Sequence, residues 1–388
     1  MIKLLAKTFI KDHNNLKSLS VRRQYGIMCS ILGIVLNLFL FGIKLFAGIL
    51  SSSIAVIADA FNNLSDSGSS IITMIGFKLA GQKPDKDHPF GHGRFEYISA
   101  LIVSLIIILM GSELVKSSIT KLISPEAIEF SLLTVIILAV SILIKIYIFY
   151  YNKKLSKKFN SESMKATAFD SLCDTLATVL TLVSIVISHF TGLYIDAWCG
   201  IIVALFILYA GFSSLKDTVS SLLGKPAEPE LVKNIEKTVM SYKEVVGIHD
   251  LIVHNYGPGR LMISLHAEVS EKADIRDSHD IIDIIERHLE EEIGCHAVIH
   301  MDPIAYDDTK TQELKLETEA IVKSIDERMS IHDFRIVIGN THTNIIFDVV
   351  VPYDKSIQNS TLKKQIEKEI KKLNEHYFAV ITIDRSYV

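Results

Sequence analysis

The stretch Leu101–Met110 reads LIVSLIIILM, ten residues without a charge, inside a longer apolar segment over about 95–122. Similar uncharged runs occur at Ile31–Phe41, Leu132–Leu143 and Ile201–Tyr209. An α-helix of about 20 apolar residues crosses the hydrocarbon core of a bilayer. The sequence therefore predicts six transmembrane helices, over about 25–50, 53–80, 95–122, 127–151, 163–190 and 195–222.

The composition divides the chain into an apolar and a polar part. Of 388 residues, 49% are hydrophobic and 22% are charged, which excludes a disordered, collagen-like or disulfide-rich chain. The formal net charge of -4 gives no sign of a nucleic-acid partner. A large soluble helical core is the alternative to a membrane domain, but it would leave too little polar surface to cover six such segments.

Lysine and arginine are distributed unevenly between the connections. They collect in the N-terminal 23 residues, in the second-to-third connection and in the fourth-to-fifth connection, whereas the turns near Ser51–Ser53 and Ser188–Tyr194 have none. Because cytoplasmic loops carry the excess of positive charge, both termini are expected in the cytosol, with the protein in the cytoplasmic membrane. Residues 1–24 are expected to form a basic cytosolic segment on the inner membrane surface, and 25–224 the transmembrane domain.

The polar part begins after Gly224-Lys225-Pro226 and predicts an α+β fold. Its pattern reads helix, strand, strand, helix, strand over 225–308, and the same order returns over 309–388. The stretch "GIHDLIVH" from Gly247 is echoed by "SIHDFRIV" from Ser330. We interpret these segments as two tandem copies of one cytosolic domain.

Acidic residues inside two predicted spans are the strongest functional signal. Asn62 and Asp66 are four residues apart, as are Asp170 and Asp174, so each pair lies on one helix face. An intramembrane carboxylate costs at least ~2.5–3.5 kcal/mol, and no lysine or arginine stands beside these acids in either span. The compensating charge is therefore expected from a divalent cation or from protons, and the four side chains offer an oxygen-rich cation site. Placement at hydrated span ends is the alternative.

Three separated stretches resemble the cation diffusion facilitators, a family of homodimeric divalent metal/proton antiporters. They are "SSSIAVIADAFNNLSDSGSS" (51–70), "PDKDHPFGHGRFE" (84–96) and "KATAFDSLCDTLATV" (165–179). The resemblance covers about 20–305. It implies a transport site at Asn62, Asp66, Asp170 and Asp174, of which the three aspartates exchange metal for protons. A quartet without histidine resembles the manganese-type bacterial branch, in line with the preference of Mn²⁺ for oxygen ligands.

The resemblance also implies two sites outside the membrane. One lies in the second-to-third loop and uses Asp85, His88 and His92, although a plain solvated loop is an equal alternative. The other lies in a copper-chaperone-like, ferredoxin-like cytosolic domain, where seven of the fourteen histidines fall within 249–300. Its matching residues are His249, His266, His279, His300 and Asp302. The second copy keeps His332 but has Asp348, Thr382 and Asp384 at the other positions. A dimerisation or regulatory element is therefore expected there, and a residual metal site is the alternative.

The sequence as a whole predicts a secondary active transporter and not an enzyme. It would export Mn²⁺ from the cytosol in exchange for protons by alternating access, as a homodimer, with the metal as substrate and regulator and with no organic cofactor. Export of Zn²⁺, Fe²⁺, Co²⁺ or Cd²⁺ is the alternative, followed by a membrane metal sensor that conducts nothing. An intramembrane metalloenzyme and a passive channel are further rivals.

Overall fold

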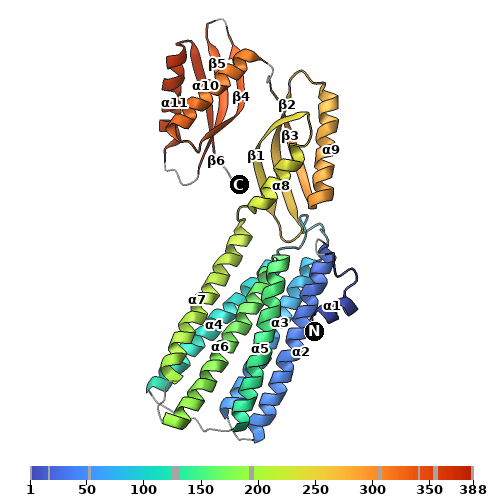
Figure 1. The fold of residues 1–388 in the computed structure, drawn as a ribbon, viewed down its shortest axis with the longest axis vertical. Coiled ribbons are helices and arrows are strands. Elements are labelled where there is room, and N and C mark those ends of the chain that lie inside the picture. The colour runs from blue at the N-terminus through green and yellow to red at the C-terminus, as the bar shows by residue number, and fades with distance from the viewer. Residues whose placement is uncertain are drawn as a thin grey trace. The chain divides into compact units, whose positions relative to one another are not determined.

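The structure is a computed structural model that describes residues 2–15, 18–50, 54–123, 132–191, 196–304, 308–339, 341–352 and 357–385. These residues form two compact units. The first comprises Met1–Lys225 with Tyr256–Gly259, and the second comprises Pro226–Asn255 with Arg260–Val388. Figure 1 shows that the first unit is built from helices and the second from helices and strands.

The helices of the first unit are α1 (Ile2–Phe9), α2 (Leu19–Leu50), α3 (Ile54–Ala80), α4 (Phe95–Ile123), α5 (Leu132–Phe159), α6 (Glu162–Thr191) and α7 (Asp196–Leu223). Within the described residues, α2, α4, α5, α6 and α7 are long and apolar enough to cross a membrane. The remaining predicted span forms the 27-residue helix α3. Its asparagines, aspartates and serines lower its mean hydropathy.

The long helices expose apolar side chains and bury polar ones. Phe46, Leu109 and Ile202 are 67%, 69% and 69% exposed. Between the helices, the hydroxyl oxygens of Ser104 and Ser214 lie 2.8 Å apart. This inversion of the usual arrangement suits a lipid environment, where apolar surface costs nothing and small polar residues hold helices together.

Two predicted segments can be compared with the helices of the first unit. The sequence predicts the fourth span over 127–151, but α5 continues to Phe159, because lysine and leucine in this stretch are good helix formers. Residues 127–131 lie outside the described residues. The basic N-terminal segment is predicted on the membrane surface. Ala6 of α1 and Ile10 after it are buried in a cluster with residues of α2 and α5, and the placement on the membrane stays a prediction.

The second unit begins with α8 (Pro229–Val239), β1 (Val245–Asn255), β2 (Leu261–Ser270), α9 (Ile275–Ile293) and β3 (Cys295–Ile304). We call these elements the first module. The strand order is β1-β2-β3, with β1 antiparallel to β2 and β2 parallel to β3. The core contains Ile235 of α8, Leu265 of β2 and Leu289 of α9, all at most 1% exposed. The helices thus pack on the sheet, and the expected α+β fold is confirmed.

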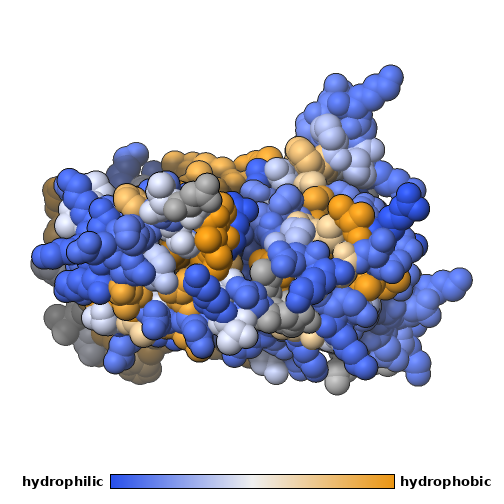
Figure 2. Space-filling model, turned by 90° about the horizontal axis from the view of Figure 1, so that it is seen from above, coloured by the Kyte–Doolittle hydropathy of each residue, from blue (hydrophilic) through white to orange (hydrophobic). Residues whose placement is uncertain are grey.

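The remaining elements, which we call the second module, are α10 (Thr309–Ile325), β4 (Ser330–Ile338), β5 (Thr343–Val351), α11 (Asn359–Leu373) and β6 (Tyr377–Arg385). The strand order is β4-β5-β6, again antiparallel and then parallel. A register shift falls between His249 and Ile252 in β1, and the corresponding shift in β4 falls between His332 and Arg335. The view from above in Figure 2 shows a largely hydrophilic face with scattered apolar patches, as expected for a domain in water.

Candidate metal sites

Three buried aspartates of the first unit lie together. Asp66 comes from α3, and Asp170 and Asp174 come from successive turns of α6; one oxygen of each carboxylate lies within 4.8 Å of the others. We call this group the acid cluster. A hydrogen bond of 3.0 Å between the hydroxyls of Thr73 and Thr167 joins the two helices nearby. Among the described residues, the Oδ1 atoms of Asp170 and Asp174 have no hydrogen-bond partner, so they are available to a cation.

A lysine accompanies the acid cluster. The ammonium of Lys145, on α5, donates to Asp66 Oδ2 at 2.6 Å and to Asp174 Oδ2 at 2.7 Å, and Lys145 is 2% exposed. The compensating charge was expected from a divalent cation or from protons, but part of it comes from this lysine, which belongs to a third helix. Three carboxylates and one ammonium still leave a net formal charge of −2. One divalent cation would neutralise it.

Two other acidic or amide side chains of α3 are arranged differently. Asp59 forms an ion pair of 2.8 Å with Lys44, whose side chain is 1% exposed, so the charge of Asp59 is balanced outside the acid cluster. Asn62 is partly buried and lies one turn before Asp66 on the same helix face. Its place in the ligand set remains a prediction.

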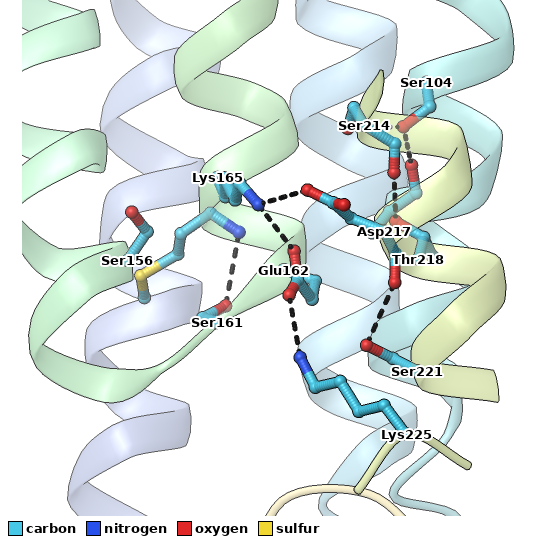
Figure 3. A network of polar contacts seen from close by, with 12 residues as sticks. Ser104, Ser156, Ser161, Glu162, Lys165, Ser214, Asp217, Thr218, Ser221 and Lys225 are labelled. Atoms are coloured by element: carbon cyan, nitrogen blue, oxygen red, sulfur yellow. Dashed lines mark hydrogen bonds and ion pairs between the residues drawn. The ribbon is translucent and has the colours of Figure 1, made fainter. Parts of the chain in front are cut away.

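Charged residues at the ends of the helices are paired with one another. Figure 3 shows Lys165 between Glu162 and Asp217, with Nζ–oxygen distances of 3.5 and 2.7 Å, and Lys225 pointing to Glu162 at 3.7 Å. The fully buried Glu96 accepts hydrogen bonds from the guanidinium of Arg22 and, at 2.6 Å, from the hydroxyl of Ser161. In these networks each carboxylate has a local cation, unlike the acid cluster, where negative charge is in excess.

The predicted loop residues Asp85, His88 and His92 lie close together between α3 and α4. Asp85 is 3.4 Å from both His88 Nδ1 and His92 Nε2, and the two rings are 4.6 Å apart. The backbone N–H of His88 donates to Asp85 Oδ1 at 2.7 Å and thereby lowers the pKa of that carboxyl. The three side chains offer one ligand atom each within 4.8 Å, an arrangement that suits a divalent cation at the loop.

The strands of the first module align the predicted cytosolic ligands. His249 of β1 pairs in register with His266 of β2, and His266 pairs with His300 of β3. Asp302 follows two residues after His300, so it lies on the same face of the sheet. Its carboxylate lies 2.8 Å from His266 Nδ1, 3.2 Å from His249 Nε2 and 3.3 Å from His300 Nε2. Three of the five predicted residues therefore converge on the carboxylate of a fourth, Asp302.

The fifth predicted residue is elsewhere. His279 lies on α9, where it is exposed and forms a 3.7 Å contact with Asp283 one turn later. Within one chain it is thus not brought to His249, His266, His300 and Asp302. Helix α9 packs against the sheet through residues of the module's core, such as Ile285 and Leu289.

The second module repeats this alignment with different residues. His332 of β4 pairs in register with Asp348 of β5, and Asp348 pairs with Thr382 of β6. Asp384 lies two residues after Thr382. His332, Asp348 and Asp384 offer ligand atoms within 4.8 Å of one another. The substitutions seen in the sequence therefore replace a histidine-rich group with a carboxylate-rich one, rather than dispersing the group.

The lysines that pair with the intramembrane acids, Lys44 and Lys145, were not predicted. A signal for Lys145 existed, since a charged residue in the middle of the apolar stretch Ile142–Tyr150 is expensive in a bilayer and needs a partner. The excess of acids in the spans of Asp66 and Asp170 was the obvious source of that partner. Without the tertiary contact between α5 and α6, however, the choice between Asp59, Asp66 and the two acids of α6 had no basis.

Comparison with known proteins extends these observations. A family profile described as the cation efflux transmembrane domain matches residues 30–223, half of the chain. A second, described as the cation efflux protein cytoplasmic domain, matches 227–304. The second module lies outside both ranges.

Individual relatives agree with the profiles. An uncharacterized transporter of Methanocaldococcus jannaschii is 34% identical over 70% of this chain and 96% of its own length. The manganese efflux system protein MneS of Bacillus subtilis is 29% identical over 71% and 94%. A cadmium, cobalt and zinc/H(+)-K(+) antiporter of Bacillus velezensis is 28% identical over 71% and 88%. With a buried carboxylate cluster between long apolar helices and an α+β cytoplasmic domain, the chain belongs to the cation diffusion facilitator family of divalent metal cation efflux transporters.

Proposed function

We propose that this transporter exports Mn²⁺ from the cytosol in exchange for protons, by alternating access around the acid cluster of Asp66, Asp170 and Asp174. The observation that carries the proposal is the net formal charge of −2 in a buried group that has carboxylate oxygens without hydrogen bonds among the described residues. A buried charge of this size needs a counter-ion, and a divalent cation matches it in sign and magnitude.

The donor set supports manganese. Three carboxylates, with the amide of Asn62 one turn from Asp66, form an oxygen-only group, and such groups suit Mn²⁺ better than imidazole-containing sites do. The manganese efflux protein among the relatives agrees with this choice. Because another relative is named as a cadmium, cobalt and zinc antiporter, export of those ions by this transporter is the alternative.

Charge balance also favours proton exchange. When the metal leaves, two protons on the carboxylates would restore neutrality while Lys145 stays bound to Asp66 and Asp174. Exchange of one divalent cation for two protons would then keep the buried group neutral in both orientations. When the group is neutral, the protein can change between its inward- and outward-facing conformations without exposing a net charge to apolar surroundings.

The remaining architecture completes the proposal. Helix α3 would be the sixth span, with its polar face toward α6 and Lys145. Both termini would lie in the cytosol of the cytoplasmic membrane, and the protein would act as a homodimer through its cytoplasmic domain. The shared strand order of β1-β2-β3 and β4-β5-β6, with register shifts at corresponding places in β1 and β4, supports two tandem copies of one domain.

Flux in proteoliposomes tests the proposal. We expect Mn²⁺ transport to be driven by a pH gradient and to be lost in Asp170→Asn. The control is Glu113→Gln, which removes an exposed carboxylate of α4 that lies 3.8 Å from Lys116. Simultaneous recording of proton and metal movement should give two protons per ion.

Several outcomes would contradict parts of the proposal. Preference for Zn²⁺ would show that the oxygen-only group does not set selectivity. Flux that ignores the pH gradient would indicate a channel. Normal flux in Asp170→Asn would remove the acid cluster from the transport path, and no flux of any metal by the unaltered protein would favour a sensor.

A further inference from the structure

Two histidines stack where the modules of the second unit meet. The ring of His249, on β1, lies over the ring of His332, on β4, with 4.3 Å between centroids and 27° between planes. A cavity of about 330 Å³ opens here, lined by residues of both modules, among them His249, Asp250, His332 and Asp384. We call this region the junction.

The buried histidine of the second module lacks hydrogen bonds. His332 is 7% exposed, and among the described residues neither of its ring nitrogens has a hydrogen-bond partner. Its Nε2 lies 3.6 Å from Asp250 Oδ1 and 3.6 Å from Asp384 Oδ2. These separations are too long for hydrogen bonds but suit ligands of a common ion. A buried imidazole with unused nitrogens is costly unless something binds it.

The sheet supplies further donors on the same face. Asp348 is the register partner of His332, and Asp384 lies on the next strand, so these three ligand atoms lie within 4.8 Å. A second group within the same limit joins His249 and Asp250 of the first module to His332 of the second. His332 therefore belongs to two overlapping groups, one inside its module and one across the junction.

The residue after each stacked histidine adopts an unusual backbone conformation. Asp250 and Asp333 occupy corresponding places at the two register shifts and have φ angles of 52° and 48°. This left-handed conformation is uncommon for residues other than glycine, asparagine and aspartate. Asp250 and Asp333 therefore occupy equivalent positions on the two sides of the junction.

We propose that the second module binds a divalent cation through His332, Asp348 and Asp384, and that Asp250 of the first module completes the site. The ion would tie the two modules together. The site is separate from the acid cluster and does not depend on the proposed transport.

The donors indicate which ions the junction takes. Three carboxylates and one imidazole form an oxygen-rich set, which suits Mn²⁺ and other borderline divalent cations with six ligands, water completing the shell. The first module offers three imidazoles and one carboxylate, a set that favours Zn²⁺. The junction site is therefore expected to prefer Mn²⁺ over Zn²⁺ more strongly than the first-module site does.

Counting bound ions in the full-length protein tests the proposal. The chain is purified in detergent, stripped with a chelator and dialysed against Mn²⁺ alone or Zn²⁺ alone, and the bound metal is measured by plasma mass spectrometry. His332→Phe keeps a ring to stack on His249 but removes the ligand. Asp384→Asn keeps the shape and removes the charge. His342→Ala, at an exposed histidine of the turn between β4 and β5, is the control.

We expect one Mn²⁺ fewer per chain in His332→Phe and in Asp384→Asn, and no change in His342→Ala. Asp250→Asn, which tolerates the left-handed backbone, should weaken binding of that ion by about 10–100-fold. Unchanged stoichiometry in both His332→Phe and Asp384→Asn would overturn the site and leave a stacked histidine pair. Full affinity in Asp250→Asn would confine the ion to the second module and overturn the link. Since no flux is measured, failure here is distinct from failure of the transport proposal.

Discussion

The acid cluster differs in ligand type and in charge from the group of His249, His266, His300 and Asp302, which we call the first-module group. In the acid cluster, three carboxylates face a single ammonium among apolar helices. In the first module, three imidazoles surround the single carboxylate of Asp302, and His300 is largely exposed to water. With histidines counted as neutral, the acid cluster has a net formal charge of −2 and is buried between helices, and the first-module group has a net formal charge of −1 beside water.

The difference in net charge and in surroundings limits what each site can do. A group with a net charge of −2 in apolar surroundings needs a counter-ion at every stage, so metal and protons must replace each other there. A group with a net formal charge of −1 beside water has no such requirement, because water can solvate the charge, and its ion can stay bound or leave without exchange. We therefore propose coupled transport for the acid cluster and metal sensing for the first-module group.

The largest expected effect comes from the acid cluster itself. Asp174→Ala removes a carboxylate that holds Lys145 and should lower the rate of Mn²⁺ transport by at least about 100-fold, since even changes next to the ligands of a metal cost about 10–100-fold. Initial flux in proteoliposomes measures this. Comparable activity in Asp174→Ala and in the Glu113→Gln control would contradict the proposed role of the acid cluster in transport.

Removal of Lys145 should have the next largest effect. Lys145→Met leaves the acid cluster with a net formal charge of −3, so the cation should bind about tenfold more tightly, a change of ~1.4 kcal/mol. The KM for Mn²⁺ and the maximal rate should both fall, because the ion leaves more slowly. Kinetics of flux check this, with Lys116→Met on the exposed part of α4 as control. A raised KM would show that Lys145 only positions the acids.

The first-module group should affect regulation and not coupling. His266→Ala breaks the 2.8 Å contact with Asp302 and should remove one bound ion per chain. We expect the transport rate to fall by about 5–10-fold, as typical for coupling between separate sites. The dependence on the pH gradient should stay unchanged, and measuring flux at several gradients tests that. Loss of proton coupling in His266→Ala would contradict the assignment of coupling to the acid cluster alone.

A smaller effect is expected at the loop residues Asp85, His88 and His92. Asp85→Asn removes an exposed charge beside His88 and His92, which should raise the KM for Mn²⁺ by about twofold at low ionic strength. At high salt the difference should disappear, because exposed charges are screened over about 10 Å. A KM change that persists in high salt would instead indicate a ligand with a lasting contact to the ion.

The smallest effect concerns the second module's stability. Asp308 precedes α10, and the hydroxyl and the backbone N–H of Thr311, which donate to its carboxylate, lower its pKa. A lowered carboxyl pKa stabilises the fold above about pH 4, and this stabilisation is lost as the pH falls through the folded value. The Asp308→Ala variant should therefore unfold at a slightly lower temperature than the unaltered protein at pH 7, and this difference should be smaller near pH 3. Thermal denaturation at both values checks this, with Glu317→Gln as control.

The residues that share a helix face or one side of a strand could be predicted from local patterns in the sequence. The spacing of four residues between Asp170 and Asp174 fixes their common helix face, because helical periodicity is a local property. Alternation along a strand likewise placed His300 and Asp302 on one side of β3. These patterns do not say which helices are neighbours, so the partner of the acids on α5 could not be found in this way. The exposed position of His279 on α9 was equally hidden.

The apolar helices, the α+β pattern with its repeated histidine stretch, and the intramembrane acids that need a counter-ion could all be inferred from the sequence. Each of these follows from periodicity, composition or the cost of a charge in lipid, which are properties of short segments. Only the tertiary structure decided that Lys145 lies between Asp66 and Asp174, and that His249 stacks on His332. Both are contacts between residues far apart in the chain, and packing of whole helices and sheets sets such contacts.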